Sequence, residues 1–130
     1  MYRIGAVRQV ALSAGRDLDN TLAFWRDVLG VPLHVRYDPP GIAFLLAGDV
    51  RLFFGDGVPP GTVYLDMTGL DDFHRAAAAQ GVPFTAAPAL VHLDREGRFG
   101  PAGEAEWMAF LKDPGGNTVG LVERKPAEPG

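Results

Sequence analysis

Residues 18–33, LDNTLAFWRDVLGVPL, and residues 70–84, LDDFHRAAAAQGVPF, are two versions of one segment. Each version begins with Leu-Asp, continues with a helix-like stretch and ends in Gly-Val-Pro followed by a large apolar residue. A strand-like stretch precedes each version, at residues 9–12 and 62–65. The shared order and spacing indicate an internal duplication, the signature of a repeated structural unit.

Each half is predicted to run strand, helix and then three strands. In the first helix Leu22, Trp25 and Leu29 recur at helical spacing, Asp17 or Asp19 is the predicted N-cap, and Gly30 follows the end. Asp71 or Asp72 lies near the start of the second helix, and Gly81 stops it. The strands that follow are predicted at residues 33–37, 42–46 and 51–54, then 89–93, 107–111 and 118–122.

The sequence therefore predicts an α+β fold that forms one domain over residues 1–130. Its first βαβββ module spans about residues 7–56, and a linker at about 55–61 contains two adjacent prolines. The second module spans about residues 62–123. The Pro-rich residues 124–130 are expected to form a flexible tail.

Composition narrows the class of function. The net charge of −4 and the scattered basic residues argue against a nucleic-acid partner. No apolar stretch approaches the ~18 residues that a membrane span needs, and no signal peptide is visible. The chain has no cysteine, which excludes disulfides and thiolate chemistry. We therefore expect a cytoplasmic protein that acts on a small molecule or a protein partner.

Strand alternation predicts which side chains face a cavity. Successive residues of a strand point to opposite faces. In the strand at residues 62–66, Val63 and Leu65 form the apolar face, so Thr62, Tyr64 and Asp66 share the mixed face. Gln9 has the corresponding position in the opening strand. These four residues are predicted to line a cavity and to orient a ligand.

Two motifs resemble the vicinal-oxygen-chelate superfamily, which includes glyoxalases, bleomycin resistance proteins and extradiol dioxygenases. One motif is the opening strand followed by residues 17–30, and the other is residues 110–123, FLKDPGGNTVGLVE. The resemblance covers about residues 8–123. It implies paired βαβββ modules whose curved mixed sheet forms a cup with helices on its outer face. It also implies a homodimer in many cases, but it does not imply one reaction.

Metal-using members of this superfamily place one ligand on each of four strands. By the resemblance these positions fall on Gln9, on Leu52 or Phe53, on Thr62 and on Gly120. Leu, Phe and Gly offer no lone pair, and a first-row metal usually needs at least three protein donors. The sequence therefore predicts that the inherited metal site is absent and that no cofactor is needed.

Two residues are candidate general bases. Asp66 could abstract a proton if desolvation raised its pKa. His92 precedes Asp94 by two residues on one strand, so the pair could act as an oriented base or as a relocated metal pair. A solvent-exposed structural role is the alternative reading of each. Asp113 and Asn117 are interpreted as turn formers.

Aromatic residues are expected to give the cup an apolar lining. Phe44, Phe53 and Trp107 are the candidates, although some of the phenylalanines must belong to the core. The irregular stretch at residues 94–106 is a candidate lid or binding loop.

The leading hypothesis is metal-independent binding or sequestration of an apolar or aromatic ligand. One alternative is a metal-independent isomerase, cyclase or lyase that uses Asp66 or His92 as its base. Another is a divalent-metal enzyme of glyoxalase or dioxygenase type with relocated ligands.

Overall fold

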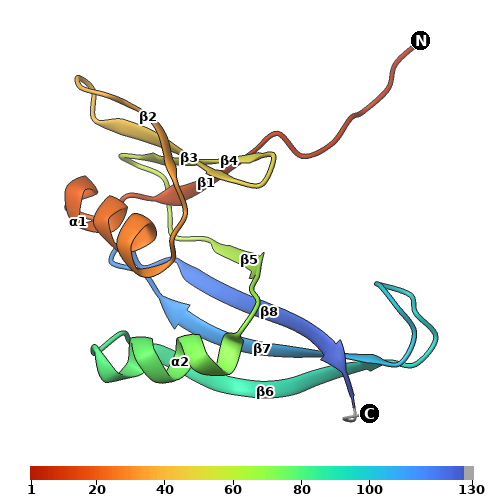
Figure 1. Ribbon diagram of the computed structural model, residues 1–130. Helices are drawn as coiled ribbons and strands as arrows, with labels where there is room; N and C mark the ends of the chain where they lie inside the picture. Colours follow the sequence, from red (N-terminus) through yellow and green to blue (C-terminus); the bar gives the residue numbers. More distant parts are fainter. Residues whose placement is uncertain (128–130) are drawn as a thin grey trace. The chain divides into compact units, whose positions relative to one another are not determined.

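The computed structural model describes residues 1–127, which divide into two compact units (Figure 1). Unit 1 contains residues 1–62 and 113–117, and unit 2 contains residues 63–112 and the chain from Thr118 onward. The first half of the chain forms β1 (Gln9–Ser13), α1 (Leu18–Ala23), the π-helical segment η1 (Phe24–Val28), β2 (Leu33–Tyr37), β3 (Ile42–Ala47) and β4 (Val50–Gly55). The second half forms β5 (Thr62–Asp66), α2 (Leu70–Ala79), β6 (Phe84–Asp94), β7 (Glu104–Lys112) and β8 (Thr118–Pro126).

The two halves have the same sheet topology. The strand order is β1-β4-β3-β2 in one four-stranded sheet and β5-β8-β7-β6 in the other. In the first sheet β1 pairs with β4 in parallel, while β2–β3 and β3–β4 are antiparallel. The predicted α+β fold of two βαβββ modules is confirmed, because the duplication read from the sequence recurs as a duplication of strand order.

The first helix begins and ends where its sequence predicts. Asp17 is the N-cap, and its Oδ1 accepts the amide of Asn20 at 3.2 Å. The helix continues through η1, and Gly30 follows at φ +73°, a left-handed conformation that glycine adopts without a steric penalty. Trp25 thereby reaches the sheet, where its ring lies 5.4 Å from that of Phe54.

Burial identifies the inner face of the first sheet. Leu52 and Phe54 of β4 are 1% and 0% exposed, and Leu12 of β1 is 1% exposed. These side chains alternate with Ala11 and Phe53, which point to the other face. The helix-facing side of this sheet is therefore filled by core residues, and the opposite side carries the exposed Ala11 and the half-buried Phe53.

The turn between β7 and β8 packs within unit 1. Asn117 Oδ1 accepts the amides of Ser13 at 2.9 Å and Gly61 at 3.0 Å, and its Nδ2 donates to Ser13 O and Asp113 Oδ2, each at 2.8 Å. Asp113 also closes the turn by accepting the amide of Asn117 at 2.7 Å. The two residues are turn formers, as expected. Residues 113–117 nevertheless belong to the first unit, whereas the sequence placed them in the second module.

The second helix is capped by a residue from another element. Gly69 precedes α2 at φ +77° and offers no side chain for a cap. The Glu123 carboxylate of β8 accepts the amide of Gly69 at 2.8 Å and that of Leu70 at 3.2 Å. A negative charge is favourable at a helix N-terminus, so this contact joins α2 to β8.

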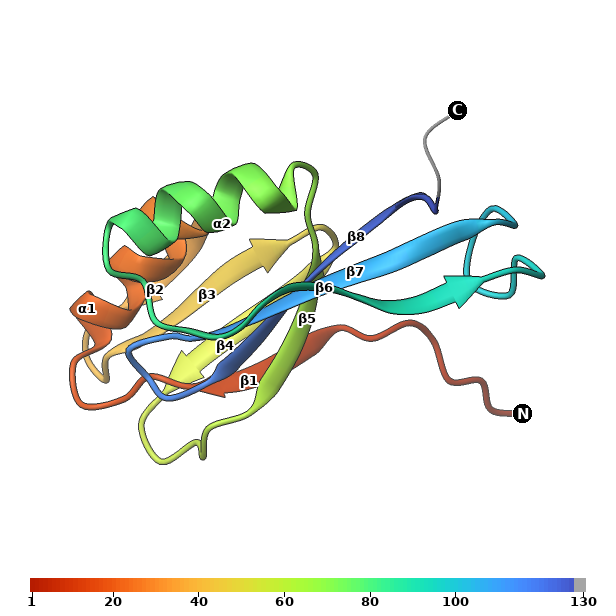
Figure 2. The same cartoon turned by 90° about the horizontal axis from the view of Figure 1, so that it is seen from below.

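The flexible tail was predicted to begin at residue 124, which is still inside strand β8. Strand β8 continues to Pro126, and the Arg124 side chain is only 18% exposed because three carboxylates surround it. Residues 128–130 of that predicted tail lie outside the described residues. Strands β6 and β7 run together to a projecting loop, visible at one end of Figure 2. Within residues 1–127, none of the helices is long and apolar enough to cross a membrane.

Candidate functional site

Pairing between β1 and β4 decides which residue shares a face with Gln9. Gln9 lies opposite Arg51 and Ala11 lies opposite Phe53 in the parallel register. Paired residues point to the same side of a sheet, and alternate residues along a strand share a face. Phe53 is therefore on the face of Gln9, while Leu52 is buried on the helix side. Of the two residues that the resemblance offers for the second ligand position, Leu52 and Phe53, only Phe53 shares the face of Gln9.

Three aromatic rings form a continuous surface on this open face of unit 1. The ring centres of Phe44 and Phe53 lie 5.2 Å apart, and those of Tyr37 and Phe44 lie 6.4 Å apart. Tyr37 is 52% exposed, and both phenylalanines are half-buried. The guanidinium carbon of Arg51 lies 5.8 Å from the centre of the Phe44 ring. The surface is apolar in its middle and cationic at one side. We call Tyr37, Phe44 and Phe53 the aromatic floor.

A second aromatic surface lies on β5 and β7 of unit 2. The Tyr64 ring packs against that of Phe110 with ring centres 5.8 Å apart, and Tyr64 is 56% exposed. A Cβ added to Gly120 would lie 2.6 Å from Tyr64 Cδ2 and 3.0 Å from Phe110 Cε1. The space that a side chain would need at position 120 is therefore filled by the Tyr64 ring.

The remaining predicted residues of β5 are exposed. Thr62 and Asp66 both point to solvent, as the strand pattern predicts. Asp66 lines an open pocket of about 340 Å³. The other residues lining this pocket are Met67, Thr68, Val122, Glu123 and Arg124. Asp66 is thus accessible to a small molecule, two residues from Tyr64 on the same face.

Trp107 does not lie on the face predicted for it. It alternates with Met108 on β7, so it points away from the side that carries Phe110 and Tyr64. Its ring instead lies 5.0 Å from Lys125 Nζ. Lys125 in turn reaches Asp71 of α2 at 3.6 Å. Trp107 is therefore linked to α2 through Lys125, and its role in lining a ligand site stays a prediction.

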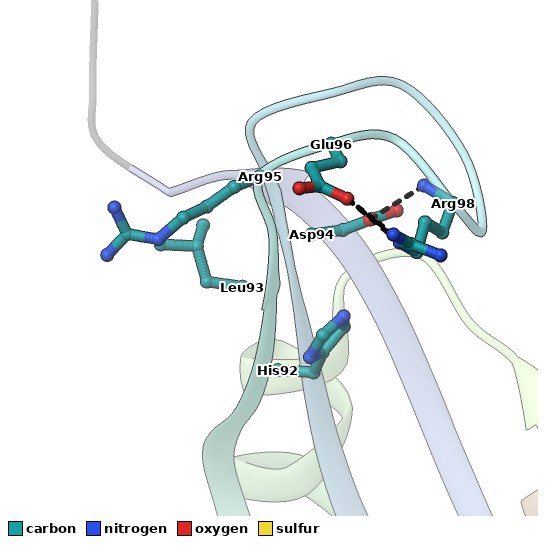
Figure 3. A pocket seen from close by; sticks show the side chains of 6 residues that line it. All are labelled: His92, Leu93, Asp94, Arg95, Glu96 and Arg98. Carbon is teal, nitrogen blue, oxygen red and sulfur yellow. Dashed lines mark hydrogen bonds and ion pairs between the residues drawn. The ribbon is translucent and has the colours of Figure 1, made fainter.

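His92 lines a small pocket of about 220 Å³ at the start of the projecting loop (Figure 3). Its ring packs at 5.8 Å from that of Phe99. Figure 3 shows His92 and Asp94 on one side of the strand, and Leu93 and Arg95 on the other. The shared face predicted for His92 and Asp94 is present.

Asp94 is nevertheless unsuited to orienting His92. Its Oδ1 accepts the amide of Arg98 at 2.8 Å, and its Oδ2 accepts the amide of Phe99 and Nη2 of Arg124, each at 2.9 Å. The Phe99 amide has the largest effect on the pKa of Asp94, and together with Arg98 and Arg124 it outweighs desolvation and lowers that pKa to about 2. Asp94 is therefore a structural carboxylate that holds the loop, and the role of His92 as a base stays a prediction.

Arg124 lies at the centre of this end of the sheet, a position that was not predicted from the sequence. Its guanidinium donates to Glu104 at 3.0 Å, to Glu106 at 2.6 Å and to Asp94 at 2.9 Å. Hydrogen bonds to these carboxylates, the one to Glu104 having the largest effect, raise the pKa of Arg124. Alternation along β7 and β8 could have placed Arg124 and Glu106 on one face, but the register between the strands was needed to pair them.

The residues at the four positions that the resemblance assigns to metal ligands do not fit a divalent metal. Gln9 offers one amide oxygen and Thr62 one hydroxyl, whereas Phe53 offers no donor atom. At the fourth position the Tyr64 ring occupies the space in which a carboxylate on residue 120 would begin. Among residues 1–127, no group of three or more His, Cys, Asp or Glu side chains is placed to hold a metal ion. We therefore assign no step to a metal.

Comparison by sequence finds no matching protein-family model and no matching curated protein. The fold is similar to that of lactoylglutathione lyase from Agrobacterium tumefaciens, with a TM-score of 0.70 and 20% sequence identity over 94% of this chain and 96% of that chain.

Two further solved structures are similar over nearly their whole length. A member of the glyoxalase/bleomycin resistance protein/dioxygenase superfamily from Sphaerobacter thermophilus is 22% identical, with a TM-score of 0.70, over 92% of this chain and 98% of that chain. A glyoxalase/bleomycin resistance protein/dioxygenase from Nocardioides is 18% identical, with a TM-score of 0.66, over 100% of this chain and 93% of that chain. At these identities the likeness shows the fold.

Proposed function

Because the chain has the fold of the glyoxalase/bleomycin resistance protein/dioxygenase superfamily, we propose that it is a metal-independent small-molecule-binding protein. Its ligand is an apolar or aromatic compound that lies on the aromatic floor, on the open face of the first sheet. The observation that carries the proposal is the replacement of donor atoms by aromatic surface. Phe53 stands at one inherited ligand position, and the Tyr64 ring covers another at Gly120.

Physical chemistry supports binding at such a surface. Small-molecule sites are mostly apolar, with a few polar groups that fix the orientation of the ligand. The aromatic floor supplies apolar area that is already in place, so little side-chain entropy is lost on binding. Gln9 shares the face with this floor and offers both donors and acceptors to a ligand. We expect these contacts to hold a flat or bulky apolar molecule by sequestration.

The proposal is tested with a neutral aromatic probe. N-phenyl-1-naphthylamine becomes fluorescent in apolar surroundings and carries no charge at neutral pH. We expect saturable binding to the natural protein and at least fivefold weaker binding to Phe53→Ala, since burying one aromatic side chain contributes roughly 1.5–3 kcal/mol. Phe99→Ala is the matched control, because Phe99 is 73% exposed on the loop and lies outside the aromatic floor. Absence of saturable binding, or equal weakening in both variants, would contradict the proposal.

Metal independence is tested by measuring the metal content and the melting temperature of the protein. We expect protein purified without chelator or metal-affinity resin to contain much less than one metal per chain. We also expect its melting temperature to stay unchanged in EDTA and with added nickel, zinc, manganese or iron(II). About one metal per chain and a melt that falls in EDTA would favour the alternative of a glyoxalase- or dioxygenase-type enzyme with relocated ligands.

A metal-independent isomerase, cyclase or lyase is the second candidate function. It is favoured by one observation: Asp66 is exposed on the face of Tyr64 and lines an open pocket. His92 is the weaker base, since Asp94 is engaged elsewhere. If a bound compound is converted, Asp66→Asn should abolish turnover while leaving its affinity within a few fold. Unchanged turnover in Asp66→Asn and in His92→Gln would remove both residues from a catalytic role.

Homodimerisation and a cytoplasmic location complete the proposal. The cysteine-free composition is compatible with a reducing compartment, and the resemblance to the superfamily supports a dimer. Sedimentation equilibrium would test the dimer directly, through a mass of about twice the 13.9 kDa of one chain.

A further inference from the structure

Arg51 places an exposed guanidinium group beside the aromatic floor. It lies on β4 opposite Gln9, with Phe53 two residues further along the same strand face. Its guanidinium carbon is 5.8 Å from the centre of the Phe44 ring, which is within the range of a cation–π contact. The side chain is exposed to solvent, so its charged group is accessible to a ligand lying on the rings.

The charge of Arg51 has no carboxylate partner within residues 1–127. Ion pairs in this part of the chain use Arg36, Arg75, Arg98, Arg124 and Lys125. Arg36, on the same sheet, contacts both Asp19 and Asp38. Arg51 instead lies over a ring that leaves the hydrogen-bond donors of its guanidinium unused. In a chain with a net charge of −4, an unpaired cation beside an apolar surface points to a negatively charged group of the ligand.

We propose that Arg51 binds an anionic oxygen group on the ligand, so that the ligand class is an aromatic or apolar acid. This inference rests on the proposed function and adds the chemical class of the ligand. A guanidinium presents its donors in a planar fork that matches a carboxylate, phosphonate or sulfonate. The apolar part of the ligand lies on Phe44 and Phe53, and the Gln9 amide hydrogen-bonds a further polar atom.

The test compares two probes that differ by one charged group. 8-Anilinonaphthalene-1-sulfonate has the ring system of N-phenyl-1-naphthylamine and adds a sulfonate. We expect the natural protein to bind the sulfonated probe about tenfold more tightly than the neutral one, as a charge-assisted hydrogen bond predicts. In Arg51→Gln that preference should disappear, through loss of affinity for the sulfonated probe alone. Arg51→Lys should retain only part of it, because an ammonium lacks the planar fork.

Arg26→Gln is the matched control. It makes the same charge change at an exposed residue of η1 in unit 1. The residue before it, Trp25, packs against Phe54 on the face of the sheet opposite to the aromatic floor. The control should keep the full preference. Equal loss in Arg26→Gln and Arg51→Gln would show a general charge effect and overturn the inference.

The two proposals fail in different ways. If the natural protein binds both probes equally, or if Arg51→Gln keeps the preference, Arg51 is not the anion site and the proposed function stands. If neither probe binds saturably, the proposed function fails and the inference fails with it. Melting curves of Arg51→Gln and Arg26→Gln should match that of the natural protein, since both side chains are exposed. Probe affinities can then be compared among folded proteins.

Discussion

The indole Nε1 of Trp25 donates a hydrogen bond of 2.7 Å to Asp113 Oδ2, joining two residues that are 88 positions apart in the sequence. Both residues are buried, with Trp25 0% exposed and Asp113 5% exposed. The same carboxylate oxygen accepts Nδ2 of Asn117 at 2.8 Å. This contact holds the turn after β7 against the helical segment of the first module. It explains why residues 113–117 belong to unit 1.

Trp25→Phe should destabilise the protein by about 1–3 kcal/mol, because it keeps an aromatic ring but removes a buried hydrogen bond to a carboxylate. The measurement is the free energy of unfolding from urea titration. Trp107→Phe makes the same change at a half-buried site and should cost less than about 1 kcal/mol. Similar losses in the two variants would show that ring size, rather than the bond to Asp113, carries the effect.

Gly120→Ala should be destabilising by about 1–3 kcal/mol, because its Cβ would collide with the Tyr64 ring. Removing the ring with Tyr64→Ala should relieve that collision. The double variant should therefore be less destabilised than the sum of the single variants by about 1 kcal/mol. Gly5→Ala, where an added Cβ meets no atom within 4 Å, is the control for the alanine itself. Strict additivity would mean that the ring moves aside freely.

Asp94 should contribute to stability in a pH-dependent way. Its folded-state pKa of about 2 lies below its ordinary value of 3.8, so the folded protein favours the charged carboxylate. The stabilisation is present above pH 4 and is lost as the pH falls through about 2. We expect the difference in urea midpoint between the natural protein and Asp94→Asn to be large at pH 6 and to shrink between pH 4 and pH 2.

The neighbours of Asp94 need a control in that experiment. Arg124, Glu104 and Glu106 form one network with it, so other groups titrate nearby. Asp49→Asn removes one carboxylate at an exposed position between β3 and β4 and controls for the change in net charge. A difference between the natural protein and Asp94→Asn that stays constant from pH 6 to pH 2 would refute the assignment.

Glu123→Ala should weaken the start of α2. The carboxylate accepts the amides of Gly69 and Leu70, and losing a helix cap costs about 0.5–2 kcal/mol. Hydrogen exchange should show faster exchange in the first turn of α2 than in its last turn. Glu96→Ala removes an exposed loop carboxylate paired with Arg98 and should leave this exchange unchanged. Uniform acceleration along α2 would indicate global destabilisation instead.

The duplicated βαβββ order and most element positions could be predicted from local sequence patterns. These features are local: Asp17 caps its own helix, Gly30 ends the helical stretch, and strand alternation places Gln9, Thr62 and Tyr64 on exposed faces. Backbone preferences and hydrophobic periodicity act over a few residues, so they can be read without the fold.

Contacts between residues far apart in the sequence depend on strand register and packing. The choice of Phe53 over Leu52 depends on the register of β1 and β4, and a shift of one residue exchanges the two faces of a strand. Pairing between β7 and β8 likewise placed Trp107 on the α2 side and brought Arg124 to its carboxylates. These contacts join residues far apart in the chain, and their partners are set by packing and register, which no local pattern encodes.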